Sequence, residues 1–331
     1  MGAWERMSAG AEDHNLRHRR FIRYLSVGRA TPSARRARVD DRYRAVVSNA
    51  PSRQRSEPPV SRPDARTTTL ARASTVLLDV LDDLGPWLLQ QSGTIASTAK
   101  ADGTPVTTAD HEADQRLEDA IRAAFPEHGV LSEERATVAP DTSWCWVIDP
   151  IDGTSNFTAG LAYWCVSVAL CLDGEVELAV IDAPPIGQRT VAVRGQGTTR
   201  DGQPCRVRPA VDWRDGRNRH VPVMLTTGTA RRARNAGLRL NPRVMGATAL
   251  DLATVAGGTA AASVALIPKV WDVAAGSLLV REAGGTVTTL HGEPLLPLRP
   301  GVEYAERSAI TASGPDASYV AELAHALLPS I

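Results

Sequence analysis

Lysine is nearly missing from this chain of 331 residues, and long apolar runs and paired cysteines are missing altogether. Only two of the 37 basic residues are lysines, Lys100 and Lys269. No run of 18 or more apolar residues occurs, so the sequence predicts no transmembrane helix and no membrane partner. The four cysteines form no Cys-x-x-Cys pair, which argues against zinc or a disulfide framework and favours a reducing, cytoplasmic setting.

The formal net charge of zero hides an uneven distribution. Residues 1–66 contain 15 Arg and 7 acidic residues, whereas residues 67–331 contain 22 basic and 30 acidic ones. We predict a disordered, Arg-rich tail over 1–66 and a folded domain over 67–331. An acidic domain lacks the cationic face that nucleic acid requires, so we expect no nucleic-acid partner for it. The tail itself is compatible with an arm for nucleic acid or a membrane surface, or with a start codon assigned too far upstream.

Helices and strands alternate without a strict repeat from residue 67 onward. Apolar residues at helical spacing predict a first helix from about residue 67, interrupted at Gly85-Pro86, and a second over 110–125. Apolar runs predict buried strands over 144–148 and 166–172, and Asp173-Gly174 predicts a hairpin into 176–181. Shorter strands are predicted over 190–193 and 205–207, and further helices over 249–256 and 273–283.

Two aspartates follow the strand over 144–148, in the hexapeptide Asp149-Pro-Ile-Asp-Gly-Thr154. The carboxyl end of a strand is where open α/β sheets place ligands. Two carboxylates held close together repel unless a cation lies between them, and all-oxygen ligands suit Mg²⁺, Mn²⁺ or Ca²⁺ rather than zinc. The alternative is a capped turn with solvated carboxylates.

Three further stretches carry acidic residues at element boundaries. Glu133 follows a short predicted strand, and Asp110 and Asp272 each open a helix. Each aspartate alone is more often a helix N-cap than a ligand. Together with Asp149-Pro-Ile-Asp-Gly-Thr154, they indicate a site for divalent cations.

These stretches, in this order, resemble the inositol monophosphatase family, with the similarity covering roughly residues 67–331. The matching segments are PVTTAD (105–110), SEE (132–134), DPIDGTSNF (149–157), GATALDLA (246–253) and WDVAAGSLLVREAGG (271–285). The resemblance implies a mixed α/β fold, a layered αβαβα sandwich of the inositol monophosphatase and fructose-bisphosphatase type, often as a homodimer. It also implies a Mg²⁺-dependent phosphomonoesterase that hydrolyses a small polyol or sugar phosphate by attack of a metal-activated water.

The resemblance assigns roles position by position, for two or three Mg²⁺ ions per site. The implied metal ligands are Glu133, Asp149, the carbonyl of Ile151, Asp152 and Asp272. Thr154, hydrogen-bonded toward Asp110, would orient the attacking water, with Glu133 as a third catalytic residue. The implied substrate-binding residues are Gly153, Thr154, Gly246, Ala247 and Thr248.

Departures from the family pattern bear on the substrate. Ala265 stands where inositol-specific relatives commonly carry a Glu, which argues against inositol itself. Tyr163-Trp164 is similar to aromatics of histidinol-phosphatase relatives, so histidinol phosphate is an alternative substrate, although aromatics packed at a sheet edge explain the pair equally well. Lys100 and Lys269 lie beside the matched motifs, so one interpretation is that they face the phosphate, but a solvated or structural lysine is the favoured interpretation of each. A non-catalytic regulatory binding protein is the alternative from another class. It is disfavoured because no predicted metal carboxylate is lost.

Overall fold

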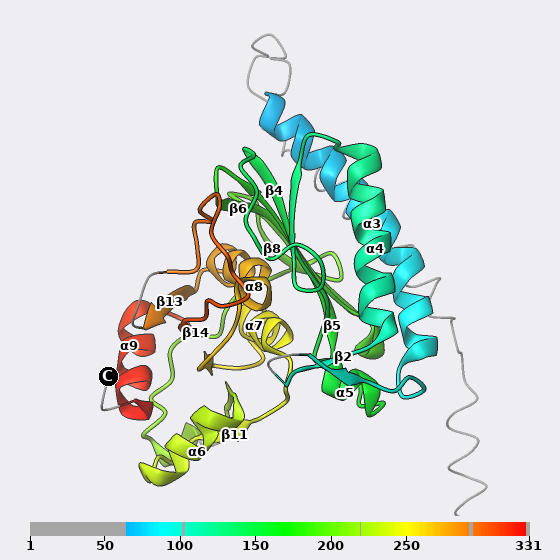
Figure 1. Ribbon diagram of the computed structural model, residues 1–331. Coiled ribbons are helices and arrows are strands. Elements are labelled where there is room, and N and C mark those ends of the chain that lie inside the picture. Colours follow the sequence, from blue (N-terminus) through cyan, green and yellow to red (C-terminus); the bar gives the residue numbers. More distant parts are fainter. Residues whose placement is uncertain (1–63, 101–102, 219, 291–293, 329–331) are drawn as a thin grey trace, which may run out of the picture.

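Helical layers and sheets alternate in five layers (Figure 1). The computed structural model describes residues 64–100, 103–218, 220–290 and 294–328. From the first layer to the last, the chain places α3 and α4, a seven-stranded sheet, α7 and α8, a five-stranded sheet, and α6 with α9. This is the predicted αβαβα sandwich. The prediction of a disordered tail concerns mainly residues 1–63, which lie outside the described residues.

The seven-stranded sheet carries the first acidic motif. Its order is β3-β4-β5-β6-β7-β8-β9, with β3 parallel to β4 and every later pair antiparallel. The strands are β3 (Gly129–Ser132), β4 (Trp144–Asp152), β5 (Cys165–Leu172), β6 (Glu175–Ala183), β7 (Gln188–Val193), β8 (Gly197–Arg200) and β9 (Gln203–Cys205). The predicted hairpin at Asp173-Gly174 is present, with both residues at positive φ. The pair Asp201-Gly202 joins β8 to β9. The strand predicted over 205–207 lies two residues earlier, as β9, and ends at Cys205.

Two long helices cover one face of this sheet. They are α3 (Ala65–Gln91) and α4 (Thr108–Ala124). Helix α3 begins two residues before the predicted domain start, capped by the Asp64 carboxylate, which accepts from Thr67 N at 2.6 Å. The predicted interruption at Gly85-Pro86 is wrong, because the helix continues through both residues. Pro86 is exposed, and because it has no N–H, the carbonyl of Asp82 lacks its helical donor and can bind water instead. Leu84 and Leu88 are buried and hold the helix on the sheet.

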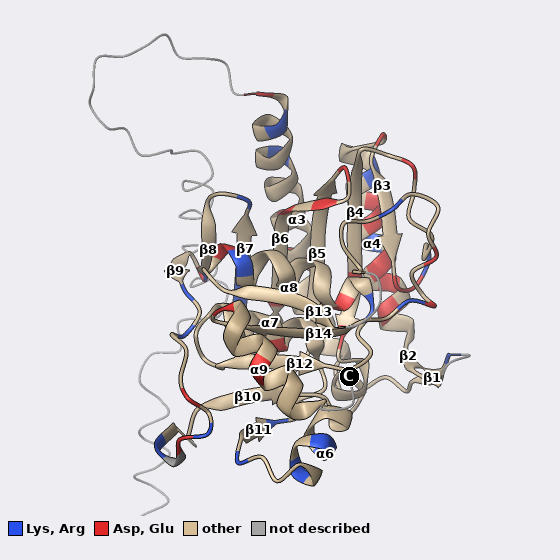
Figure 2. Ribbon diagram, turned by 90° about the vertical axis from the view of Figure 1, so that its left-hand side faces the viewer, with Lys and Arg blue, Asp and Glu red and all other residues tan. Residues whose placement is uncertain are grey.

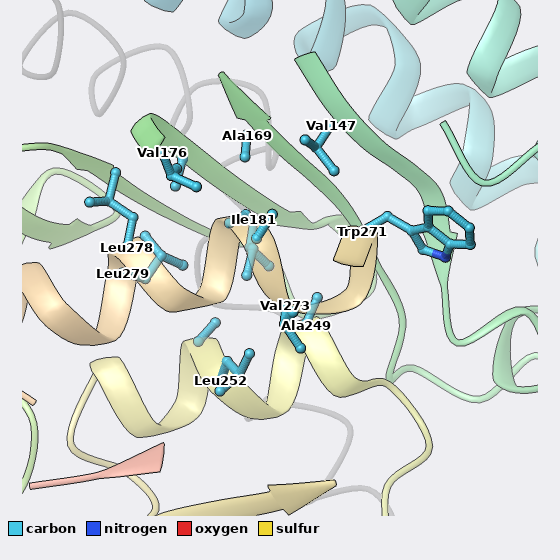
Figure 3. Close-up of a cluster of buried hydrophobic side chains, with 14 of the residues drawn as sticks. Val147, Ala169, Val176, Ile181, Ala249, Leu252, Trp271, Val273, Leu278 and Leu279 are labelled. Atoms are coloured by element: carbon cyan, nitrogen blue, oxygen red, sulfur yellow. The ribbon is translucent and has the colours of Figure 1, made fainter. Parts of the chain in front are cut away.

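Helices α7 (Thr248–Ala256) and α8 (Val270–Glu282) form the middle layer. Figure 3 shows their apolar side chains meeting the sheet: Leu278 and Leu279 of α8 lie beside Val176 and Ile181 of β6. Nearly every α8 residue is buried because the helix is covered on both sides by sheets, which explains its weak amphipathic pattern. Helix α8 begins three residues before its predicted start, so Asp272 lies in its first turn.

The second sheet and its covering helices form the remaining two layers, and sequence patterns predicted none of these elements. The sheet order is β11-β10-β12-β14-β13, with β10 parallel to β11 and β12 and the other pairs antiparallel. The strands are β10 (Pro222–Leu225), β11 (Asn241–Arg243), β12 (Ala262–Ala265), β13 (Thr286–Leu290) and β14 (Ile310–Gly314), and the helices are α6 (Thr227–Asn235) and α9 (Ala317–Leu327). A two-stranded ribbon, β1 (Thr98–Ala99) with β2 (Pro105–Val106), precedes α4. Among the described residues, none of the helices combines the length and the apolar character that a membrane crossing demands.

Candidate metal and phosphate site

Strand β4 ends on the two aspartates of the first motif. The pairing of β4 with β5 shifts register between Asp149 and Asp152, where Pro150 lies. Both residues are buried, with Asp149 2% exposed and Asp152 7% exposed. The carboxylate of Asp149 accepts from its own motif, because Ile151 N donates to Asp149 Oδ1 at 3.0 Å. Both aspartates at this irregular strand end line the same cavity.

Three carboxylates from three elements converge at this edge. Glu133 follows β3, Asp149 is in β4 and Asp272 is in the first turn of α8; one oxygen from each lies within 4.8 Å of the other two. Burial raises the pKa of Asp149 well above its usual value, and the surrounding carboxylates, Glu133 foremost, raise it further. Burial and the neighbouring Asp152 likewise raise the pKa of Asp272. Anions this close are stable together only with a proton or a cation between them.

Asp152 has a different setting from the three converging carboxylates. Its Oδ2 accepts from Ala249 N at 2.7 Å and Leu250 N at 3.3 Å, and its Oδ1 accepts from Thr248 N at 3.1 Å. The first residues of α7 receive no cap from their own segment, so Asp152 supplies it from the neighbouring strand. Burial raises the pKa of Asp152 to about 7 against the lowering by these N–H groups. The cap joins the acidic site to Thr248 of the predicted substrate segment.

The predicted pair of Thr154 and Asp110 is in contact. Thr154 Oγ1 lies 3.2 Å from Asp110 Oδ1 and 3.1 Å from the carbonyl oxygen of Ile151. Asp110 Oδ2 accepts from the backbone N–H and the hydroxyl of Thr107, at 2.8 and 2.6 Å, which closes a capping box at the start of α4. Burial raises the pKa of Asp110 despite these donors. Because Asp110 accepts from it, the Thr154 hydroxyl can direct its own lone pairs toward a water molecule.

Lys100 brings a positive charge to the same edge. Its ammonium donates to Glu133 Oε1 at 2.7 Å and to Glu134 Oε1 at 2.6 Å. Burial lowers the pKa of Lys100, but Glu133 and Glu134 outweigh burial and the net shift is upward. Burial raises the pKa of Glu134 to about 7. These two ion pairs are compatible with the structural role favoured for Lys100 from the sequence, although the sequence did not identify its partners.

A cavity of about 530 Å³ opens over these groups. Its lining includes Glu133, Asp149, Ile151, Asp152, Gly153, Thr154, Gly246 and Asp272, all predicted site residues, together with both lysines. Gly153 and Gly246 both have positive φ, and a Cβ on Gly153 would lie 3.1 Å from Ala247 Cβ. Ala247 itself is buried and Thr248 donates to Asp152, so neither is among the lining residues.

The match to a known family covers most of the chain. A model of the inositol monophosphatase family matches residues 65–327. The chain belongs to the inositol monophosphatase family. Nus factor SuhB of Pasteurella multocida (strain Pm70) is 33% identical over 215 residues, which are 60% of this chain and 76% of that protein.

Solved structures in the same family have the same fold. The extragenic suppressor protein suhB from Bartonella henselae superposes with a TM-score of 0.66 at 28% identity, covering 78% of this chain and 99% of the other. An IMPase from Thermotoga maritima gives a TM-score of 0.66 at 27% identity, covering 78% and 97%.

The sequence suggested that Ala265, Tyr163 and Trp164 bear on the choice of substrate, but none of them lines the cavity. Ala265 is buried at the end of β12 and is not among the lining residues, whereas Ile267 and Lys269 are. Trp164 is fully buried edge-on against Phe157, and the hydroxyl of Tyr163 donates to Asp251 Oδ1 at 2.7 Å. Both aromatics therefore serve packing and positioning at the sheet edge, and neither is among the lining residues. Sequence reasoning also missed Ala305 and Ser308, which line the cavity from a loop without any motif.

Proposed function

We propose that this protein is a Mg²⁺-dependent phosphomonoesterase acting on a small polyol or sugar phosphate. The convergence of Glu133, Asp149 and Asp272 beneath a cavity large enough for such a molecule is the observation that carries the proposal. Family membership supports a phosphatase fold, and the positions of Thr154 and Asp110 support hydrolysis.

The residues present fit magnesium. All candidate donors are carboxylate or carbonyl oxygens, which suit a hard cation, and their burial and mutual repulsion leave a need for positive charge. Glu133, Asp149 and Asp272 would hold the metal, with Asp152 and the carbonyl of Ile151 beside them. When bound, Mg²⁺ would neutralise charge on the phosphate and make a nearby water more acidic.

The remaining chemistry belongs to the side chains and backbone of this protein. The Thr154 hydroxyl donates to Asp110 Oδ1 at 3.2 Å, so its oxygen would accept a hydrogen bond from the attacking water. This hydrogen bond would orient the water toward phosphorus. Gly153 and Thr154 line the cavity at the start of α5 (Thr154–Thr158), where their N–H groups would bind phosphate oxygens. No nucleophilic side chain is required, so the reaction would need no covalent intermediate.

A phosphate-release screen tests this proposal. Inositol 1-phosphate, fructose phosphates, histidinol phosphate, 3′-phosphoadenosine phosphates and an aryl phosphate would be compared with Mg²⁺ and with EDTA. We expect release from at least one small phosphate with Mg²⁺, none above background with EDTA, and inhibition by Li⁺ as in the family. Full activity without metal, or no release from any substrate, would contradict the proposal.

A second candidate function comes from the names of the relatives. Relatives such as the Pasteurella multocida protein are named Nus factor SuhB, the name of a factor and not of an enzyme. If this chain acted as a non-catalytic regulatory protein, Asp149→Asn would leave its cellular role intact while abolishing phosphate release. Complementation of a deletion strain by Asp149→Asn would separate the two functions.

A further inference from the structure

The only two lysines of the chain both line the cavity, although the other 35 basic residues are arginines. Lys100 is neutralised there by Glu133 and Glu134. Lys269 has no carboxylate within ion-pair distance among the described residues. Its ammonium donates to the backbone carbonyl of Ala305, which leaves two of its three N–H groups for a ligand. The cavity therefore contains one ammonium group that no carboxylate binds directly, although Asp272, whose Oδ2 accepts from Lys269 N at 2.8 Å, lies close enough to attract it.

The wall around Lys269 differs from the metal and phosphate side. Lys269 and Ile267 line the cavity from the loop between β12 and α8. Ala305 and Ser308 line it from the loop before β14. Every carboxylate in the lining, Asp272 beside Lys269 included, is one assigned to the metal site. A neutral polyol needs acceptors for its hydroxyl protons, and this wall offers chiefly an ammonium group and a hydroxyl. An anion complements these donors better than a polyol does.

We propose that Lys269 is a specificity-determining residue for phosphate monoesters whose alcohol part carries a second anionic group, either a carboxylate or another phosphate. The inference rests on the proposed function and names the substrate class of the same site. The compact ammonium would contact the second anion while the first phosphate occupies the wall at Gly153 and Thr154. A charge-assisted hydrogen bond of this kind corresponds to about 10- to 150-fold in kcat/KM.

Matched substrates and matched variants test the inference. 3-Phosphoglycerate and glycerol 3-phosphate differ only in a carboxylate against a hydroxymethyl group, and fructose 1,6-bisphosphate and fructose 1-phosphate differ by one phosphate. The ratio of kcat/KM within each pair would be measured with Mg²⁺ for the unaltered enzyme, Lys269→Gln and Lys269→Arg. Arg231→Gln is the control, because it removes one positive charge from α6, where Figure 2 shows basic residues on the exterior.

We expect Lys269→Gln to lower at least one of the two ratios by about 10- to 150-fold, Lys269→Arg to restore most of that loss, and Arg231→Gln to leave both ratios unchanged. The substrate pair whose kcat/KM ratio falls shows whether Lys269 binds a carboxylate or a second phosphate. An equal loss on both members of each pair would show that Lys269 acts on the reacting phosphate or on folding and would overturn the inference. Unchanged ratios in a folded Lys269→Gln protein would overturn it as well. Absence of Mg²⁺-dependent release from any substrate is a separate outcome, in which the proposed function itself fails.

Discussion

At the scale of single residues, Asp149 combines two properties that oppose each other. It is needed at the centre of the acidic site, yet its charge is buried among other carboxylates. Such a residue stabilises the protein with a cation present and destabilises it without one. The acidic site therefore favours cation binding and lowers the free energy of unfolding when no cation is bound.

Asp149→Asn tests this opposition directly. The amide keeps the volume of the side chain but removes the charge, so phosphate release should fall to background. In EDTA the variant should melt at a higher temperature than the unaltered protein, by about 2–4 °C for each kcal/mol of repulsion relieved. It should also lose the stabilisation that Mg²⁺ gives the unaltered protein. Asp173→Asn, in the exposed turn after β5, is the matched control; a lower melting temperature for Asp149→Asn in EDTA would contradict the repulsion argument.

Thr154 separates water orientation from metal binding. Thr154→Ala removes the hydroxyl that Asp110 holds at 3.2 Å, and we expect kcat to fall by about 100-fold or more. Calorimetry should show Mg²⁺ affinity within a few-fold of the original, because no metal carboxylate changes. Thr154→Ser keeps the hydroxyl and should recover most of the rate. A large loss of Mg²⁺ affinity in the alanine variant would mean that Thr154 is part of the metal site.

At the scale of elements, one carboxylate often fixes two segments at once. Asp152 ends β4 and caps α7, and Asp110 caps α4 while it contacts Thr154 at the start of α5. The hexapeptide Asp149–Thr154 and the acids at helix starts indicated a cation site, and the family resemblance implied that Thr154 and Asp110 meet. The cap on α7 could not be predicted, because it joins residues 96 or more positions apart whose approach depends on the packing of the middle layer.

Helix α4 also contacts β3 through a buried acid that the proposed mechanism does not use. Asp114 Oδ1 accepts from the Ser132 hydroxyl, while Oδ2 is buried without a hydrogen-bond partner in the described chain and lies 4.0 Å from Arg135 Nε. Burial raises the pKa of Asp114 to about 6, against the lowering by Ser132. The folded state therefore binds a proton more tightly than the unfolded chain, whose aspartate titrates near 3.8. This contribution to stability is complete below about pH 4 and is lost as the pH rises through 6.

We therefore expect Asp114→Asn to flatten the fall in stability between pH 4 and pH 7. A shift of about two pKa units corresponds to about 3 kcal/mol, an upper bound on the gain at pH 7. Chemical denaturation in EDTA at several pH values would measure the difference without interference from bound metal. Asp119→Asn, an exposed substitution on the same helix, should leave the pH profile unchanged. A steeper profile in Asp114→Asn would show that the carboxylate is stabilised by Arg135 more than it is destabilised by burial.

At the scale of the whole molecule, prediction succeeded where patterns were local. Continuous apolar runs marked β4, β5 and β6, and the family resemblance supplied the five layers. The second sheet escaped pattern reading because β10, β11 and β12 have only three or four residues each, too few to show a period. The wall at Ala305 and Ser308 escaped for another reason: a loop without regular structure is placed by the elements it joins, and nothing in its own residues indicates a cavity.

The domain boundary yields the last prediction. Helix α3 begins at Ala65 on the Asp64 cap, and Arg66 contacts the sheet through a salt bridge to Glu177 of β6. We expect a protein that begins at residue 64 to keep its melting temperature and kcat, because it retains the cap and the salt bridge. A protein that begins at residue 70 loses both, and it should melt lower while its kcat changes little, since neither group reaches the cavity. If the protein that begins at residue 64 instead melts as low as the shorter one, or fails to accumulate in soluble form, residues 1–63 contribute to the fold and the proposed boundary is wrong.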